Sequence, residues 1–173
     1  EKIKNENPEW DRRFRIEHAQ HLRDEDLKNF SEFGVLASMQ PVHLLDDGNW
    51  AYKRLGNDRI ISSYKIKSLL RNNASVSFGT DWPVAPLNPL LGIFAAVTRR
   101  TSDEKNPDGW IPEEKISVEE AVRCYTINSA YAGFQENIIG SIEVGKLADL
   151  IVLSEDIFSI SPEKIKDIKV DMT

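Results

Sequence analysis

Strand-like and helical segments alternate through the first hundred residues, and this alternation limits the possible folds more than any other feature. Short apolar runs predict strands over residues 13–17, 35–39 and 76–79. Helical patterns follow them over residues 23–34, 60–70 and 89–98, the last beginning with a proline, which a first helical turn tolerates. Strands separated by helices form βαβ units with a parallel sheet, so the sequence predicts the α/β class.

The last third of the chain has a different pattern. Ser117 and Glu120 form a capping box that opens a helix expected to reach about Tyr131. A turn-rich stretch over 140–146, strand-like runs over 149–153 and 168–172, and a short helical pattern over 162–167 follow. We therefore expect an α/β part over residues 1–135 and a small β appendage over residues 136–173.

Composition excludes several classes of function. The 173 residues carry a net charge of −6 and show no basic stripe, which argues against a nucleic-acid partner. No apolar run approaches the ~20 residues of a membrane helix, so we expect no membrane association. Cys124 is the only cysteine, and a chain without a disulfide framework suits a reducing compartment. We expect a cytoplasmic protein in which Cys124 is buried and inert.

Polar side chains follow each of the three predicted strands. The strand ends read E-H-A-Q at His18, S-M-Q-P-V-H at Gln40 and His43, and G-T-D-W-P at Asp81 and Trp82. In parallel α/β folds, functional residues gather at the carboxyl ends of the strands. We therefore expect these side chains to lie close together, with Gly79 providing the bend that turns Asp81 into view.

Each of these residues also has an ordinary structural interpretation. Asp81 could be a turn carboxylate that caps local amides, and His18 a hydrogen-bonded core histidine. His43 is equally compatible with a loop histidine held by backbone groups. Trp82 could simply pack in the core. His21 lies three residues after His18, a spacing that places it on the other side of an extended strand, so we expect it to be solvated.

Five segments, in this order and spacing, resemble the C-terminal part of an amidohydrolase-superfamily metal-dependent hydrolase. They are R-I-E-H-A-Q, A-S-M-Q-P-V-H, F-G-T-D-W-P-V, P-L-L-G-I-F-A-A-V-T-R and G-S-I-E-V-G-K-L-A-D-L-I-V-L. The resemblance covers residues 13–173 and points to the branch that includes N-substituted formamide deformylase. It implies the C-terminal part of a (β/α)8 TIM barrel, with its last three strand–helix units, and a small β-sandwich portion.

The resemblance also implies roles for individual residues. His18 matches a metal-binding histidine after the sixth barrel strand, and Asp81 matches the aspartate after the eighth, a ligand that also transfers protons. His43 falls after the seventh strand, where a substrate-facing residue is expected, and Gln40 and Trp82 would contact substrate. The implied cofactor is a divalent metal, Zn²⁺ first, with Fe²⁺ or Mn²⁺ as alternatives.

The sequence departs from the family pattern because several ligands are missing. It has no His-x-His motif, no fifth-strand histidine and no candidate for the bridging lysine. A complete barrel takes about 250 residues. We therefore expect a C-terminal fragment that lacks most metal ligands and is inactive in isolation.

Several functions are compatible with these features. The first is a metal-dependent amidohydrolase that cleaves non-peptide C–N bonds in small amides or formamides. The alternative is a catalytically inactive relative that binds a small molecule or regulates a partner. A stand-alone α/β module would leave open apolar sheet edges and would have to form homo-oligomers or aggregate. Glycoside hydrolysis is disfavoured because it needs a carboxylate pair and only Asp81 ends a strand convincingly.

Overall fold

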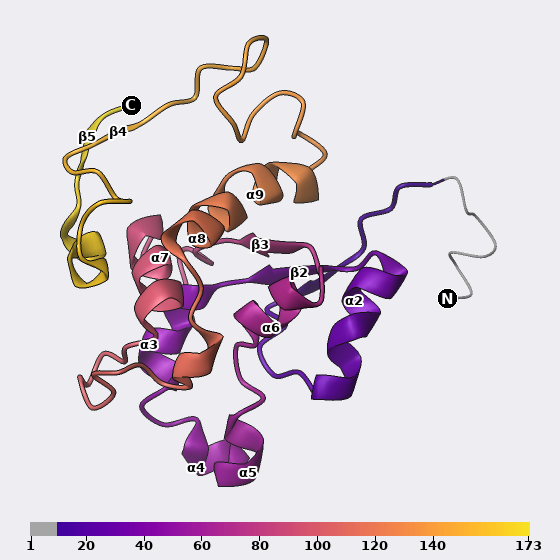
Figure 1. Cartoon of the computed structure of the whole chain (residues 1–173), viewed down its shortest axis with the longest axis vertical. Helices are drawn as coiled ribbons and strands as arrows, with labels where there is room; N and C mark the ends of the chain where they lie inside the picture. The colour runs from indigo at the N-terminus through magenta and orange to yellow at the C-terminus, as the bar shows by residue number, and fades with distance from the viewer. Residues whose placement is uncertain (1–9) are drawn as a thin grey trace.

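The computed structural model describes residues 10–173. Three strands form a parallel sheet in the order β1 (Arg15–Glu17), β2 (Leu36–Met39) and β3 (Val76–Phe78) (Figure 1). In register, Ile16 lies beside Ala37, and Ala37 beside Val76. The α/β class with a parallel sheet, predicted from the alternation of segments, is confirmed.

The strands differ in burial. Ala37, Met39 and Val76 have no exposed surface, so β2 and β3 lie in the hydrophobic core. All three residues of β1 are exposed, as expected for an edge strand whose outer side faces solvent. The free edge of the described sheet on this side therefore presents Ile16 and, just before the strand, Phe14 to solvent.

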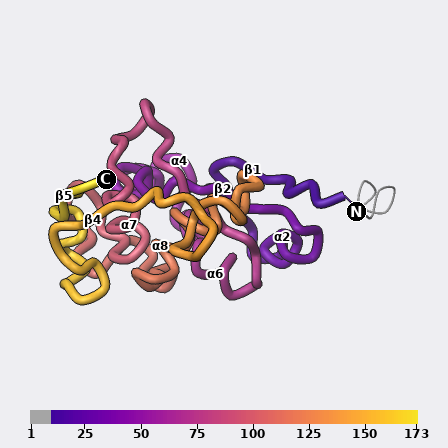
Figure 2. The backbone as a smooth tube through the Cα atoms, turned by 90° about the horizontal axis from the view of Figure 1, so that it is seen from above, coloured from indigo at the N-terminus to yellow at the C-terminus, as the bar shows by residue number. Residues whose placement is uncertain are grey.

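Helices connect the strands and cover one side of the sheet. The first connection contains the 3-10 helix η1 (Asp24–Asp26) and α2 (Leu27–Phe33), which ends at Gly34 in the left-handed conformation that glycine adopts readily. Helices α6 (Ile66–Arg71) and α8 (Val118–Tyr125) lie on the same side of the strands (Figure 2). Helix α7 (Pro89–Thr98) has the predicted bounds, and the Asn88 side chain accepts a hydrogen bond from the Leu90 amide.

The helix predicted over residues 60–70 is wrong in its first half. The connection between β2 and β3 instead contains η2 (Pro41–His43), α3 (Leu44–Asp47), α4 (Tyr52–Leu55), α5 (Asn57–Ile60) and α6. Between α5 and α6 the chain makes a turn at residues 61 and 62, and Ser63 pairs with His21 in an isolated antiparallel bridge. Tertiary pairing with the loop after β1 therefore overrides the local helical pattern.

The capping box of Ser117 and Glu120 is present, but the helix it opens is shorter than expected. Thr126, with φ −111° and ψ −97°, interrupts it, and α9 (Ile127–Ala132) follows. The Thr126 hydroxyl donates to the Val122 carbonyl, a local bond that a β-branched threonine makes at a helix end.

The tail runs away from the helices and returns beside α7 (Figure 1). It includes a short antiparallel pair, β4 (Val152–Leu153) and β5 (Val170–Met172), and the 3-10 helix η4 (Pro162–Asp167). Both strands lie within the predicted runs but are shorter. The remaining described element is the 3-10 helix η3 (Pro112–Glu114).

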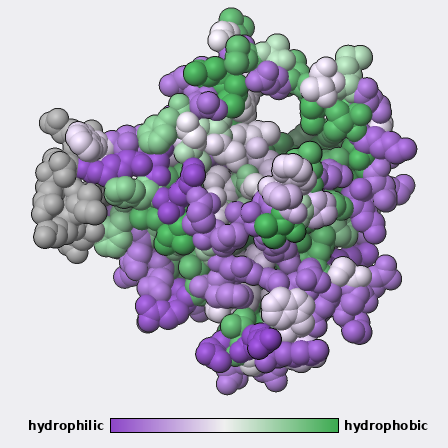
Figure 3. All heavy atoms as spheres, turned by 180° about the vertical axis from the view of Figure 1, so that it is seen from behind, coloured by the Kyte–Doolittle hydropathy of each residue, from purple (hydrophilic) through white to green (hydrophobic). Residues whose placement is uncertain are grey.

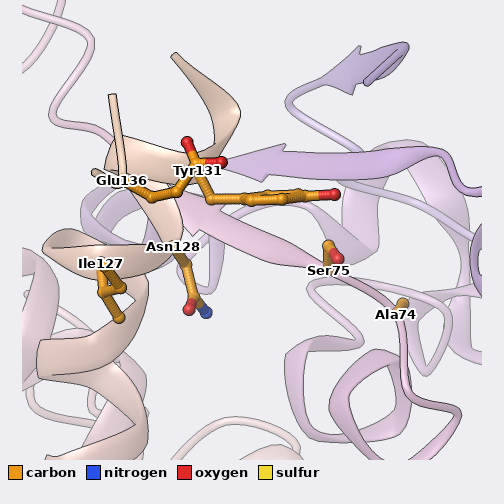
Figure 4. A pocket seen from close by; sticks show the side chains of 6 residues that line it. All are labelled: Ala74, Ser75, Ile127, Asn128, Tyr131 and Glu136. Atoms are coloured by element: carbon orange, nitrogen blue, oxygen red, sulfur yellow. The ribbon is translucent and has the colours of Figure 1, made fainter. Parts of the chain in front are cut away.

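A hollow opens at the amino end of β3, lined by residues near both β3 and α9 (Figure 4). The lining residues are Ala74, Ser75, Ile127, Asn128, Tyr131 and Glu136. The guanidinium of Arg13 lies 3.8 Å from the centre of the Tyr131 ring and 4.2 Å from that of Phe134. Glu136 binds the same guanidinium through both carboxylate oxygens, at 2.6 and 2.8 Å. Arg13 thereby joins the segment before β1 to the segment after α9.

No helix within residues 10–173 is long and apolar enough to cross a membrane.

Candidate metal centre

Three side chains meet at the carboxyl end of the sheet, one from the end of each strand. His18 directly follows β1, His43 is the last residue of η2 after β2, and Asp81 lies three residues beyond β3. One potential ligand atom from each residue lies within 4.8 Å of the other two. The structure therefore brings together the three strand-end residues that the sequence places at the carboxyl ends of parallel strands.

Asp81 and His43 form a direct contact within this group. The Nε2 atom of His43 lies 3.1 Å from the Oδ2 atom of Asp81. The ring centres of His18 and His43 are 6.3 Å apart, with the planes tilted by 42°. His18 is exposed, whereas His43 and Asp81 are partly buried, so the cluster opens to solvent on the His18 side.

The backbone that carries these side chains adopts an uncommon conformation. His18 has φ 66°, Ala19 has φ 43° and Asp81 has φ 59°. Non-glycine residues seldom adopt left-handed values, and such residues collect at functional sites where surrounding structure holds them. Gly79, the residue expected to provide the bend, has no positive φ. The residue of this segment with a left-handed backbone is Asp81 itself.

Helices α8 and α9 hold the strand that leads to Asp81. The hydroxyl of Tyr125 donates to the carbonyl of Gly79 at 3.3 Å, and that of Ser129 donates to the carbonyl of Phe78 at 2.9 Å. Gly92 leaves room for Tyr125, since a Cβ there would lie 1.8 Å from the Tyr125 hydroxyl. These supporting residues were missed from the sequence, which carries no local signal for contacts between distant segments.

The other residues assigned to substrate lie beside the cluster. Gln40 is buried at the end of β2, and its carbonyl accepts a hydrogen bond from the His43 amide at 3.2 Å. Trp82 is 64% exposed, so it does not pack in the core of the described chain. An exposed aromatic residue next to Asp81 leaves its predicted role as a substrate contact open.

His21 lies outside the cluster. The residue is exposed, as predicted, although its ring is partly buried where the Nδ1 atom lies 3.0 Å from the Ser63 hydroxyl. Burial lowers the pKa of this imidazole, which favours the neutral form. Cys124 is fully buried, and burial raises the pKa of its thiol to about 12. The expectation that Cys124 is buried is confirmed, and a thiol of this kind stays protonated near neutral pH.

The donor set has the chemistry of a divalent metal site. Imidazole nitrogen and carboxylate oxygen are ligands for Zn²⁺ and Fe²⁺, and three protein ligands leave room for water or substrate. Among residues 10–173, no other group of three or more His, Cys, Asp or Glu side chains has comparable geometry. The residues present therefore fit a divalent cation.

Residues 1–173 match the sequence profile of the amidohydrolase family. The chain belongs to this family. The superfamily inferred from the five sequence segments is therefore confirmed.

Curated relatives extend this result. The chain is 46% identical over 149 residues to Protein LONG AFTER FAR-RED 3 of Arabidopsis thaliana, covering 86% of this chain and 25% of that protein. It is 33% identical over 171 residues to the putative amidohydrolase YtcJ of Bacillus subtilis, covering 99% of this chain and 32% of the relative. N-substituted formamide deformylase of Arthrobacter pascens is 31% identical over 114 residues, or 66% of this chain and 20% of that enzyme. The chain thus spans a third or less of the length of these relatives.

A solved structure shares the same arrangement. An uncharacterized metal-dependent hydrolase from Pyrococcus horikoshii superposes with a TM-score of 0.74 at 30% sequence identity, covering 86% of this chain and 30% of that protein. The similarity supports the α/β architecture described above.

Proposed function

We propose that this chain contributes His18, His43 and Asp81 to the active site of a metal-dependent hydrolase that cleaves non-peptide C–N bonds. The observation that carries this proposal is the convergence of the three side chains within 4.8 Å, one from the end of each parallel strand. Family membership supports the reaction class, and relatives whose names include a deformylase support amides or formamides as substrates.

His18 and Asp81 are the proposed ligands, with Zn²⁺ as the first candidate and Fe²⁺ or Mn²⁺ as alternatives. A divalent cation held there would polarise a carbonyl and lower the pKa of a bound water toward about 7. The exposed imidazole of His18 has a free nitrogen to offer, and its left-handed backbone turns it toward Asp81 and His43.

Asp81 has the geometry of a proton-transfer group. Its Oδ2 atom lies 3.1 Å from His43 Nε2, so a histidine protonated at Nε2 donates to this oxygen. The other carboxylate oxygen is then available to accept the proton of an attacking water and to return it to the leaving nitrogen. His43 would orient Asp81 through its Nε2–H in the free protein, and would turn this N–H to the oxygen of the scissile carbonyl when substrate is bound.

Gln40 and Trp82 would form part of the substrate pocket, at the two strand ends beside His43 and Asp81. A small amide-type molecule is the proposed substrate. We further propose that residues 1–135 correspond to three strand–helix units of a (β/α)8 barrel and residues 136–173 to part of a β-sandwich. The remaining metal ligands of such a site would lie in sequence outside these 173 residues.

The test is a hydrolysis assay on the complete protein that carries this sequence. The protein would be loaded with Zn²⁺, Mn²⁺ or Fe²⁺ and assayed on a panel of formamides, linear amides and cyclic amides. We expect turnover with at least one class, reduced ~10²–10⁴-fold by Asp81→Asn because the proton acceptor is lost. Metal binding without turnover on any substrate would instead favour the inactive, small-molecule-binding alternative.

A further inference from the structure

A partly buried hydrogen-bond network joins the segments that carry His18 and His43. Its side chains are Gln20, Asp47 and Tyr64, here called the Tyr64 network. The Tyr64 hydroxyl donates to Asp47 Oδ2 at 2.7 Å, and Gln20 Nε2 donates to the Tyr64 hydroxyl at 2.7 Å. Gln20 also donates to Asp47 Oδ2. Each pair in the network is therefore in direct contact.

Two members of the Tyr64 network lie only a few residues from His18 and His43 in the sequence. Gln20 is two residues beyond His18 in the loop after β1. Asp47 is four residues beyond His43, at the end of α3, which continues directly from η2. Residues four apart on a helix share a face, so the position of Asp47 is tied to that of His43.

Tyr64 is itself held firmly between these segments. Its backbone amide donates to the Gln20 carbonyl at 2.7 Å, and the Leu22 amide donates to the Ser62 carbonyl at 3.0 Å. Only 1% of Tyr64 is exposed, and its φ is 52°. Burial raises the pKa of the Tyr64 hydroxyl far above its usual range, so the hydroxyl remains a donor.

A buried arginine fixes the same segment from the other side. Arg99 is fully buried and donates to the Tyr64 carbonyl at 2.9 Å and to the Trp110 carbonyl at 2.7 Å. Carbonyl acceptors and the nearby Trp110 ring, 5.8 Å from the guanidinium, surround this charge. Burial lowers the Arg99 pKa to about 10, which leaves the group charged at neutral pH. The segment that carries Tyr64 is thereby anchored to the end of α7.

We infer that Tyr64 is a positioning residue that sets the separation of His18 and His43 through Gln20 and Asp47. The inference rests on the proposed metal centre, because it gives these contacts a role in holding the donor atoms in place. Tyr64 contacts none of the three donor side chains. Its effect is transmitted through two hydrogen bonds and a short stretch of backbone on each side.

The test compares Tyr64→Phe with a matched control, Ser68→Ala, in the complete protein that carries this sequence. Both substitutions remove one hydroxyl that donates to a carboxylate, that of Asp47 in the first case and that of Glu114 in the second. Two quantities are measured: the affinity for Zn²⁺ by competition with a chelating dye, and hydrogen exchange of the metal-free chain over residues 18–22 and 43–48. Gln20→Met serves as a second variant if Tyr64→Phe does not fold.

We expect Tyr64→Phe to weaken Zn²⁺ binding by about tenfold, as outer-shell substitutions typically do, and to speed exchange in both segments. Ser68→Ala should change neither quantity. Equal behaviour of the two variants in both measurements would overturn the inference. If the unsubstituted complete protein binds no Zn²⁺, the proposed metal centre fails, and exchange alone decides whether Tyr64 couples the two segments.

Discussion

The carboxylate of Asp81 contacts His43 through one oxygen, Oδ2, and in the proposed centre its other oxygen would bind a cation or accept a proton from water. A carboxylate in an ordinary turn would satisfy nearby amides, and the Asp81 carbonyl does accept the Val84 amide at 2.8 Å. That bond uses the backbone and leaves the side chain for His43. Because the backbone carbonyl of Asp81 makes the turn bond and its side chain contacts His43, a functional carboxylate is favoured over a simple turn residue.

His43 can be separated experimentally from His18 because only His43 is hydrogen-bonded to Asp81. We expect His43→Ala to lower turnover by the complete protein by ~10²–10³, the usual cost of removing one donor to a developing oxyanion. The affinity for metal should fall less than it does for His18→Ala. Kinetics and Zn²⁺ titration of both variants check this, and an equal loss of affinity would make His43 a ligand.

The contact between Arg13 and Glu136 predicts a pH dependence of stability. The hydrogen bond from Arg13 holds the Glu136 pKa at about 2, against about 4.3 in an unfolded chain. A lowered pKa adds stability above the unfolded value, and this is lost as the pH falls toward the folded value. Glu136→Gln should therefore lower the melting temperature at pH 7, and the difference from the unsubstituted chain should vanish near pH 2. A constant difference across that range would contradict the assignment.

Helices α8 and α9 protect the second edge of the sheet. The carbonyls of Val76 and Phe78 point away from β2, and the side chains of Asn128 and Ser129 donate to them, both at 2.9 Å. Buried carbonyls without a donor are costly, so these side chains replace the neighbouring strand that is absent on this edge.

Ser129→Ala should lower the free energy of unfolding by about 1–3 kcal/mol, because it removes the one hydroxyl hydrogen that the carbonyls of Phe78 and Cys124 share. Ser31→Ala, which removes an exposed hydroxyl bonded to the Lys28 carbonyl, is the control and should change little. Urea unfolding of both variants provides the measurement. Equal stability of the two variants would show that α9 does not cap the edge.

Substitutions at Gly92 and Gly79 allow a second matched comparison, because both glycines lie beside Tyr125. A Cβ at Gly92 would meet the Tyr125 hydroxyl at 1.8 Å, whereas one at Gly79 would meet nothing within 4 Å. We expect Gly92→Ala to destabilise the chain by about 1–3 kcal/mol through overpacking, and Gly79→Ala to cause no loss. Thermal unfolding of the two variants measures the difference. A melting temperature unchanged by Gly92→Ala would mean that Tyr125 moves aside freely.

Elements with strong local signals could be predicted from the sequence, and elements decided by tertiary contacts could not. The capping box of Ser117, the bounds of α7 and the three parallel strands follow from residue type and periodicity. The turn and bridge at Ser63 depend on pairing with His21, a partner 42 residues away. The clustering of His18, His43 and Asp81 was predicted from the sequence, because each follows a strand of a parallel sheet. The hydrogen bond between His43 and Asp81, and the Tyr64 network, arise only in the folded chain.

The molecule as a whole exposes much apolar surface at β1 and along the tail. Hydrophobic side chains gather over the upper part of the face seen in Figure 3, where the tail stands apart from the helices. In the tail, Ile142, Leu147 and Ile151 are exposed, as are Phe14 and Ile16 beside the sheet edge. Apolar surface of this extent is typical of a face that is covered by other protein.

We therefore expect the 173-residue chain to self-associate in solution. Light scattering over a range of concentrations should show a mass above the 19.7 kDa of one chain. Ile16→Lys, which places a charge on the exposed edge strand, should reduce the association. A monodisperse monomer with a cooperative melt would contradict this expectation.

Metal binding tests the central claim most directly. Titration of the complete protein that carries this sequence with Zn²⁺, repeated for His18→Ala and Asp81→Ala, measures whether the clustered donors hold a cation. The proposed centre predicts one bound ion per chain and an affinity that falls roughly tenfold or more in each variant, since a lost ligand costs at least as much as a lost outer-shell partner. Absence of binding, or binding that both substitutions leave unchanged, would contradict it.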